Sequence, residues 1–159
     1  MSVRHIVLAL AAMLVAAIAT PAEACTLCSC ITSTTALNFG NYDPTVASPD
    51  DASATVSIDC SGIVSLFGLV EVKAGTGQSN SFNQRTMRRL GVSLNYNLFA
   101  NSPRTQILGD GTGGTTTVTS SLNGLLFFST SVPVYGRAPA GQWVAAGTYT
   151  DTIQITVQY

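Results

Sequence analysis

Four cysteines are the residues of this 159-residue chain with the most distinctive chemistry. Cys25, Cys28 and Cys30 follow the spacing C-x-x-C-x-C, and Cys60 lies farther along the chain. Four thiolates can bind a structural metal ion, and a C-x-x-C pair can act as a thioredoxin-like redox centre. An even number of cysteines in an exported protein instead predicts structural disulfides. The compartment in which the chain folds therefore decides between these interpretations.

The N-terminus has the composition of a secretory signal peptide. Arg4 precedes an apolar run over residues 6–19, and a small-residue cleavage motif ends at Ala24. This order predicts a signal peptide over residues 1–24, removed after Ala24, and one mature domain over residues 25–159. The apolar run is shorter than the roughly 20 residues that a membrane-spanning helix needs. Export to an oxidising compartment favours structural disulfides. A redox centre is not favoured, because it would require a βαβ pattern around the cysteines and none is present.

The composition of the mature domain excludes several classes of function. His5 is the only histidine of the chain, so its removal leaves no imidazole for Ser-His-Asp or Cys-His catalysis or for a histidine-containing zinc site. Charged residues make up only 9% of the chain and the net charge is −1, so a basic face for nucleic acid is not expected. We therefore expect neither an enzyme nor a cofactor-binding protein.

Two further motifs match the sequence patterns of functional sites but lack the structural setting that such sites need. Residues 109–114 fit G-x-G-x-x-G, but the threonine-rich stretch that follows is a poor start for the helix that a dinucleotide site requires. Asp50 and Asp51 are neighbours, so on a strand their side chains would point to opposite faces. We expect a loop at the glycines and a solvated turn at the aspartates.

The basic cluster is formed by Arg85, Arg88 and Arg89. Three arginines can bind an anion or a polysaccharide. Arginines beside a loop more commonly form a solvated edge, because charged side chains are rarely buried. The sequence therefore predicts an exposed edge here.

The elements that would position these residues are strands. Short runs of alternating apolar and polar residues are separated by Gly, Asn, Asp, Ser and Pro, which predicts an all-β sandwich. The expected strands span residues 35–39, 54–60, 66–74, 92–98, 125–135 (one strand or two) and 153–159. Residues 109–121 are expected to form a flexible loop, and Pro133 an edge or a bulge.

Three of these strands have an apolar face that bears on the fold or on assembly. Val56, Ile58 and Cys60 share one face, so Cys60 points to the core as a buried disulfide would require. Val70 and Val72 are likewise expected to point inward. The run at residues 153–159 ends the sequence on an apolar strand, and an uncovered edge of that kind tends to aggregate.

Short segments distributed in order over the mature domain carry a family resemblance. They are Cys30-Ile31-Thr32, LNFGNYDP at 37–44, VSIDC at 56–60, NQRTM at 83–87, LNYNLF at 94–99, LGDG at 108–111, VYGR at 134–137 and AGTYTDTI at 146–153. Together they resemble the spore coat protein U family, which includes the archaic (Csu-type) chaperone–usher pilus subunits.

The resemblance implies an incomplete immunoglobulin-like β-sandwich that lacks its final strand and is completed by donor-strand complementation. A strand of a periplasmic chaperone would fill the open groove, and at the outer-membrane usher the N-terminal segment of a neighbouring pilus subunit would replace it. The family spacing implies a Cys30–Cys60 disulfide, which leaves Cys25 and Cys28 to pair with each other or with a partner.

The resemblance also implies which residues contact the inserted strand. Ile153, Ile155 and Val157 would line the groove, and the carboxylate of Tyr159 would occupy the basic anchor site of the chaperone. The expected groove and chaperone contacts are Phe39, Val56, Ile58, Ile153, Ile155, Val157 and Tyr159.

One departure from the family concerns the donor segment. Only residues 25–29 precede Cys30 in the mature domain, which is too short for a donor strand. The sequence therefore favours a distal, non-enzymatic subunit of an archaic pilus on the surface of a Gram-negative bacterium, serving attachment and biofilm formation. A stand-alone secreted or spore-coat protein of the same fold is the alternative. A secreted carbohydrate-binding or hydrolytic β-sandwich is a third, less favoured hypothesis.

Overall fold

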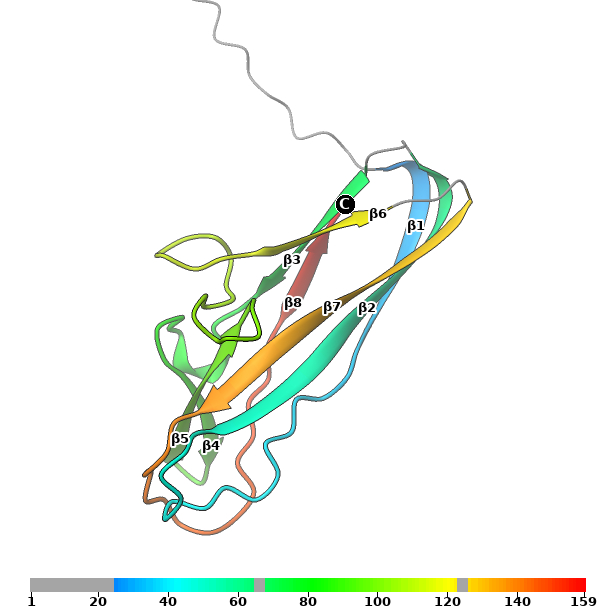
Figure 1. The fold of residues 1–159 in the computed structure, drawn as a ribbon. Coiled ribbons are helices and arrows are strands. Elements are labelled where there is room, and N and C mark those ends of the chain that lie inside the picture. The colour runs from blue at the N-terminus through cyan, green and yellow to red at the C-terminus, as the bar shows by residue number, and fades with distance from the viewer. Residues whose placement is uncertain (1–24, 65–67, 123–125) are drawn as a thin grey trace, which may run out of the picture.

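The computed structural model describes residues 25–64, 68–122 and 126–159. The strands are β1 (Cys25–Thr34), β2 (Asp50–Val64), β3 (Gly68–Ala74), β4 (Arg85–Arg89), β5 (Val92–Phe99), β6 (Val118–Leu122), β7 (Phe127–Ala138) and β8 (Ile155–Gln158), with a short 3₁₀ turn, η1 (Gly77–Ser79). They form a five-stranded sheet of order β1-β2-β7-β5-β4 and a three-stranded sheet of order β6-β3-β8 (Figure 1). The predicted all-β class is confirmed. No helix in the described ranges is long and apolar enough to cross a membrane.

The antiparallel pair β2–β7 forms the middle of the larger sheet. Its register runs from Asp50 opposite Ala138 to Ser61 opposite Phe127. Alternate residues face the core, so apolar and polar side chains separate onto the two faces. Pairing of β7 with β5 covers only residues 135–137, so Pro133 lies beyond it and has β2 on one side, which is an edge-like position.

The core fills the space between the two sheets. Val56, Ile58 and Val132 of the larger sheet and Val70 and Val72 of the smaller one are almost completely buried. The inward orientation predicted for Val70 and Val72 is therefore confirmed. Burial of a side chain of this size stabilises the fold by about 1.5–3 kcal/mol.

The first strand lies upstream of its predicted position. Residues 35–39 were expected to form it, but β1 ends at Thr34 and the chain continues as an extended segment outside the ladder. The backbone N–H of Thr35 still donates to the carbonyl of Thr55 (3.0 Å), whereas the N–H of Thr55 donates to the Thr35 hydroxyl (2.8 Å). A side chain thus replaces the carbonyl in the ladder, and regular pairing stops there.

Two strands lie where the sequence predicted none. Residues 118–121, within the predicted flexible loop, belong to β6 and pair with β3. The arginine cluster forms β4, which is joined to β5 by a two-residue turn. Leu90 and Gly91 have φ of 47° and 85° in that turn, as tight hairpins between twisted strands require.

A side chain covers part of the edge of β5. The Gln142 carboxamide accepts a hydrogen bond from the N–H of Asn95 (2.7 Å) and donates one to its carbonyl (2.9 Å). The Tyr42 hydroxyl holds Gln142 in place by accepting from its N–H (2.9 Å) while donating to the Pro139 carbonyl (2.6 Å).

A candidate strand-binding groove

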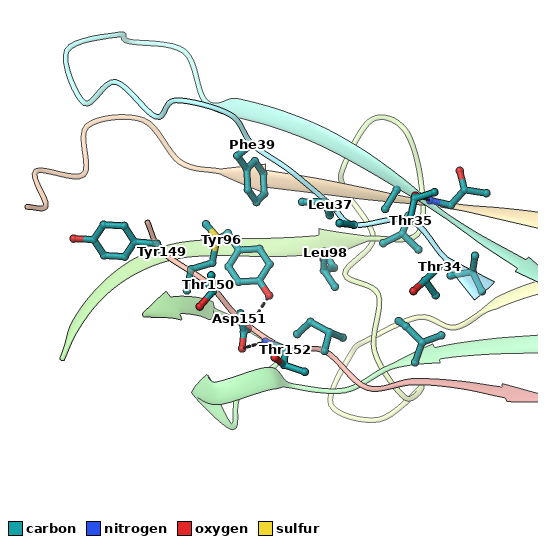
Figure 2. Close-up of a pocket in the computed structure, with 18 residues that line it drawn as sticks. Thr34, Thr35, Leu37, Phe39, Tyr96, Leu98, Tyr149, Thr150, Asp151 and Thr152 are labelled. Atoms are coloured by element: carbon teal, nitrogen blue, oxygen red, sulfur yellow. Dashed lines mark hydrogen bonds between the residues drawn. The ribbon is translucent and has the colours of Figure 1, made fainter. Parts of the chain in front are cut away.

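An apolar groove of about 400 Å³ lies between the first and last segments of the domain (Figure 2). Thr34, the last residue of β1, and residues 35–37 and Phe39 just after it form its N-terminal wall. Residues 149–153, which lead into β8, and Ile155, its first residue, form its C-terminal wall. Its floor consists of Ala54, Thr55, Val56, Met87, Tyr96, Leu98 and Val134. The Phe39 ring packs edge-on against the ring of Tyr96 with their centroids 5.9 Å apart, which stiffens one end of this surface.

The structure brings together four of the seven residues predicted to contact an inserted strand. Phe39, Val56, Ile153 and Ile155 all line the groove. Ile58 does not, because its side chain is completely buried in the core. Val157 packs partly against the core, and Tyr159 lies past the end of β8 with 45% of its surface exposed.

The C-terminal wall has an open backbone edge. β8 is the outer strand of the smaller sheet, where it pairs with β3. The N–H of Gly75 donates to the carbonyl of Gln154 (2.8 Å). Because hydrogen-bonding directions alternate along an antiparallel pair, the backbone groups of Ile153, Ile155 and Val157 point away from β3. These groups line the free edge of the sheet.

The N-terminal wall has a matching edge. β1 is the outer strand of the larger sheet, and the bond from Thr35 to Thr55 fixes the same alternation there. The backbone groups of Thr32 and Thr34 therefore point away from β2. β1 begins and β8 ends at the same end of the domain, so the two edges are antiparallel (Figure 1). A single inserted strand would be parallel to one edge and antiparallel to the other.

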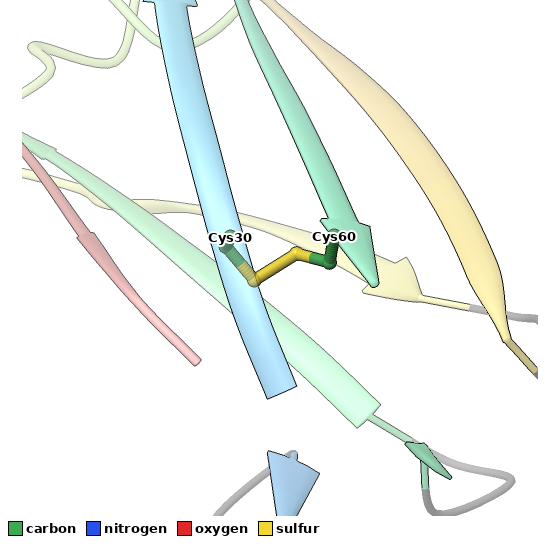
Figure 3. Close-up of a disulfide and its surroundings, with 2 residues drawn as sticks. All are labelled: Cys30 and Cys60. Carbon is green, nitrogen blue, oxygen red and sulfur yellow. A yellow bond between two sulfur atoms is a disulfide. The ribbon is translucent and has the colours of Figure 1, made fainter. Parts of the chain in front are cut away.

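A disulfide holds the N-terminal wall in place. Cys30 and Cys60 lie directly opposite each other in β1 and β2, with Cα atoms 4.0 Å apart, and their sulfur atoms are bonded (Figure 3). The predicted Cys30–Cys60 pairing is therefore confirmed, and it leaves too few thiols for a four-thiolate metal site. The side chains of Cys25 and Cys28 are outside those that the structure describes, so their pairing stays a prediction.

A polar cluster fixes the C-terminal wall. The Tyr96 hydroxyl donates to one carboxylate oxygen of Asp151 (2.7 Å), and the other oxygen accepts from the N–H groups of Gln78 (3.0 Å) and Thr152 (2.8 Å). Burial raises the pKa of Tyr96, and the bond to Asp151 raises it further, so the phenol remains a donor. Gly77 has φ of +65°, and a Cβ there would collide with the Asp151 carboxylate. Only glycine permits this contact.

Arg85 lies buried behind this cluster, which corrects the prediction of a solvated edge at this residue. Alternation along β4 points Arg85 and Met87 inward, and Arg85 is completely inaccessible. Its guanidinium donates to the carbonyls of Gly75 (2.7 Å) and Leu108 (2.8 Å) and to the Asn97 side chain (2.6 Å). Burial lowers the pKa of Arg85, and these acceptors offset the cost of burying its charge.

A second cavity of about 480 Å³ adjoins the groove, and we call it the end cavity. Leu37, Phe39, Met87 and Tyr149 line both spaces. The remainder of the end cavity is formed by Leu94 and by the loops at residues 38–44 and 144–148. No sequence pattern indicates this cavity, because most of its lining comes from loops without a periodic pattern.

Comparison with known proteins assigns the family. The model of the Spore Coat Protein U domain matches residues 10–156. The chain belongs to the Spore Coat Protein U domain family. This spore coat U domain is 30% identical over 136 residues to Protein U of Myxococcus xanthus, a match that covers 77% of the chain and 71% of that protein.

A solved structure shares the fold of the spore coat U domain. It is the CsuC–CsuE chaperone–tip adhesion subunit pre-assembly complex from archaic chaperone–usher Csu pili of Acinetobacter baumannii. The match has a TM-score of 0.57 and 23% identity and covers 84% of the present chain. The chain spans 40% of the length of the solved chain.

The other predicted motifs of the spore coat U domain lie outside the groove. Asp51 belongs to β2, and its carboxylate accepts from Arg137 (2.7 and 2.8 Å) and lies 3.3 Å from a nitrogen of Arg104, so the predicted turn at Asp50–Asp51 is wrong. Residues 109–114 form a loop as expected, in which Asp110 accepts from the N–H and hydroxyl of Thr112.

Proposed function

We propose that this chain is an exported structural subunit of a chaperone–usher pilus of the archaic type, and that its groove binds a strand of a partner protein. The observation that carries the proposal is the pair of open backbone edges on the two sides of one apolar groove. Family membership supports it, as does the fold shared with a subunit solved in complex with a chaperone.

The inserted strand would satisfy both edges at once. Its backbone would bond to the outward groups of residues 32–34 and 153–157, and alternate side chains would enter the groove. Three apolar side chains buried there would stabilise the complex by about 5–9 kcal/mol before the ordering cost is counted. A periplasmic chaperone would supply the strand first, and a neighbouring subunit would replace it at the outer-membrane usher, with surface attachment and biofilm formation as the role of the pilus.

The N-terminal part of the mature domain supports a subunit that accepts a strand. Residues 25–29 belong to β1 and pair with β2, so they are held in the fold rather than free to enter another subunit. This arrangement supports the distal position proposed from the sequence. The signal peptide over residues 1–24, with cleavage after Ala24, is part of the same proposal.

A second candidate function is a stand-alone secreted or spore-coat protein of the same fold. The similarity to Protein U of Myxococcus xanthus favours it. The two candidates differ in one measurable property, which is whether the groove requires a chaperone strand during export.

Co-purification with a pilus chaperone from a periplasmic extract tests the proposal. Ile155→Asp places a charge in the groove without a partner and should abolish the complex, since an unpaired charge there costs several kcal/mol. Gln154→Asp is the matched control, because the Gln154 side chain is exposed and a surface change usually costs about 0.5 kcal/mol or less. Recovery of Ile155→Asp with the chaperone at wild-type levels would refute the assignment of this groove.

A further inference from the structure

Arg88 and Arg89 differ from the other cations in the described parts of the chain. Neither side chain has an acceptor or a carboxylate partner there. The remaining cations are all engaged: Lys73 with Glu71, Arg104 and Arg137 with Asp51, and Arg85 with buried acceptors. Arg88 is exposed, as expected for a solvated cation, whereas Arg89 is half-buried. A half-buried guanidinium without a counter-charge is available to pair with a carboxylate of a partner.

Arg89 lies at the rim of the end cavity. Alternation along β4 places it on the same face as Met87, about 7 Å farther along the strand. Met87 lines both the groove and the end cavity. The Arg89 side chain lies against Gly147, which lines the end cavity and has φ of +147°. A Cβ at Gly147 would collide with the Arg89 guanidinium, so the glycine leaves room for it and holds its position.

The sign of the charge changes along the C-terminal wall. Asp151 places a carboxylate inside the groove, where it is engaged by Tyr96 and two N–H groups. The backbone of Arg88 bridges to Thr150, so Arg89 lies opposite Tyr149, two residues toward the end cavity from Asp151. An acidic side chain entering at Asp151 would be repelled, whereas the same side chain at the rim would meet Arg89.

An apolar strand alone does not define its own register. A purely alternating pattern fits equally well after a shift of two residues, because the side-chain period is two. A charged residue at one end of the groove removes that ambiguity, since only one register of the inserted strand places an opposite charge next to it.

We infer that Arg89 selects and registers the inserted strand by pairing with an acidic side chain at the end that reaches the end cavity. The partner is thus an extended segment with alternating apolar residues and an aspartate or a glutamate at the end that reaches the end cavity. The planar guanidinium suits this role, because it binds a carboxylate through two parallel hydrogen bonds. This inference rests on the strand-binding function proposed above.

Synthetic peptides of about nine residues test the pairing. Each alternates isoleucine with serine and carries Glu, Gln or Lys at either its first or its last position, and its affinity for the purified mature protein is measured by fluorescence anisotropy. Glu should improve binding about tenfold over Gln at one end only, and Lys should weaken binding at that end. High salt should reduce the difference.

Variants of β4 identify the residue responsible. Arg89→Gln should remove the preference for Glu, and Arg89→Glu should transfer it to the Lys peptide. Arg88→Glu is the matched control, because Arg88 is the next residue in β4 and its side chain points to solvent. This variant should keep the preference for the Glu peptide. Equal binding of the Glu and Gln peptides at both ends of the wild type would refute the pairing alone, even if neither Arg89 variant folds. Failure of every peptide to bind would refute the strand-binding function itself.

Discussion

The hydroxyl of Tyr96 donates to the carboxylate of Asp151 over 2.7 Å, and this contact joins β5 of the larger sheet to the segment that enters β8 of the smaller one. It is a direct polar link between the floor of the groove and its C-terminal wall. The pair therefore helps to set the width of the groove, together with the bonds from Gln78 to Asp151 and Thr150 and the backbone bonds of Thr150 and Gln154.

Removal of the Tyr96 hydroxyl should destabilise the domain. Tyr96→Phe removes the side-chain donor to one carboxylate oxygen of Asp151, and a bond to a charged acceptor contributes about 1.5–3 kcal/mol to the free energy of unfolding. Urea denaturation measures the loss. Tyr149→Phe is the control, because the Tyr149 hydroxyl donates to an exposed carbonyl, that of Ala145 (2.8 Å), and its loss should be below about 1 kcal/mol. Equal losses in the two variants would contradict a structural role for the pair.

The disulfide should be a major contribution to stability. Cys30 and Cys60 are 30 residues apart, and closure of a loop of that size contributes about 3–4 kcal/mol in the chain-entropy model. The double variant Cys30→Ala/Cys60→Ala should lose that amount in the presence and absence of reductant alike. Non-reducing peptide mapping of the wild type checks the pairing, and a dominant Cys28–Cys60 or Cys25–Cys60 peptide would contradict it.

A covalently supplied strand should stabilise the isolated domain. The open edges and the apolar groove predict that mature protein alone is unstable or aggregates. Fusion of a partner's donor segment after Tyr159 should raise the melting temperature by about 20 °C, because strand and groove then form one core. The control is a fusion with the same residues in scrambled order. A two-state, soluble monomer whose melting temperature does not respond to the donor segment would contradict the prediction.

Two adjacent acids should respond to pH with opposite signs. The hydrogen bond from Arg137, together with the charge of Arg104, lowers the pKa of Asp51 from its usual 3.8, whereas burial and the charge of Asp51 raise the pKa of Asp50. The stability that Asp51 contributes is present above pH ~4, the unfolded pKa, and is lost as the pH falls through the lower folded pKa. Asp50 acts in the opposite direction, because its ionisation above its folded pKa destabilises the fold.

Urea denaturation at neutral and acidic pH separates these effects. Asp51→Asn should lower the free energy of unfolding at pH 7 by at most about 1 kcal/mol, since the ion pairs are partly exposed, and should have little effect at pH 3 or below. Asp50→Asn should slightly raise it at pH 7. The same sign of change for both variants at pH 7 would contradict the assignment.

The sequence was informative where alternation of side chains determines burial. The runs around Val56, Val70 and Leu94 have one apolar face, so β3 and β5 were predicted close to their bounds and β2 over its middle part. β1 was missed because residues 25–34 are mostly serine, threonine and cysteine, which do not divide into an apolar and a polar face. Its partner strand and the disulfide hold it in place instead.

The candidate site was predictable only in part. The resemblance indicated a groove beside the last strand, but the sequence does not show which stretch of the β2 apolar face is covered, and Ile58 was therefore placed in the groove although it lies in the core. The burial of Arg85 depends on the carbonyls of Gly75 and Leu108, which come together only in three dimensions. No local sequence pattern indicates that these backbone carbonyls will meet the guanidinium.

The carboxamide of Gln142 occupies the backbone hydrogen-bonding groups at the edge of β5. It presents one donor and one acceptor to Asn95, as a peptide group of a further strand would. A foreign chain cannot add to β5 at that point, because the backbone groups it would need are already taken. In the described part of the chain, no side chain bonds in this way to the outward backbone groups of Thr34 and Ile155. The edge of β5 is therefore closed to a further strand, whereas the edges of β1 and β8 that border the groove are open to one.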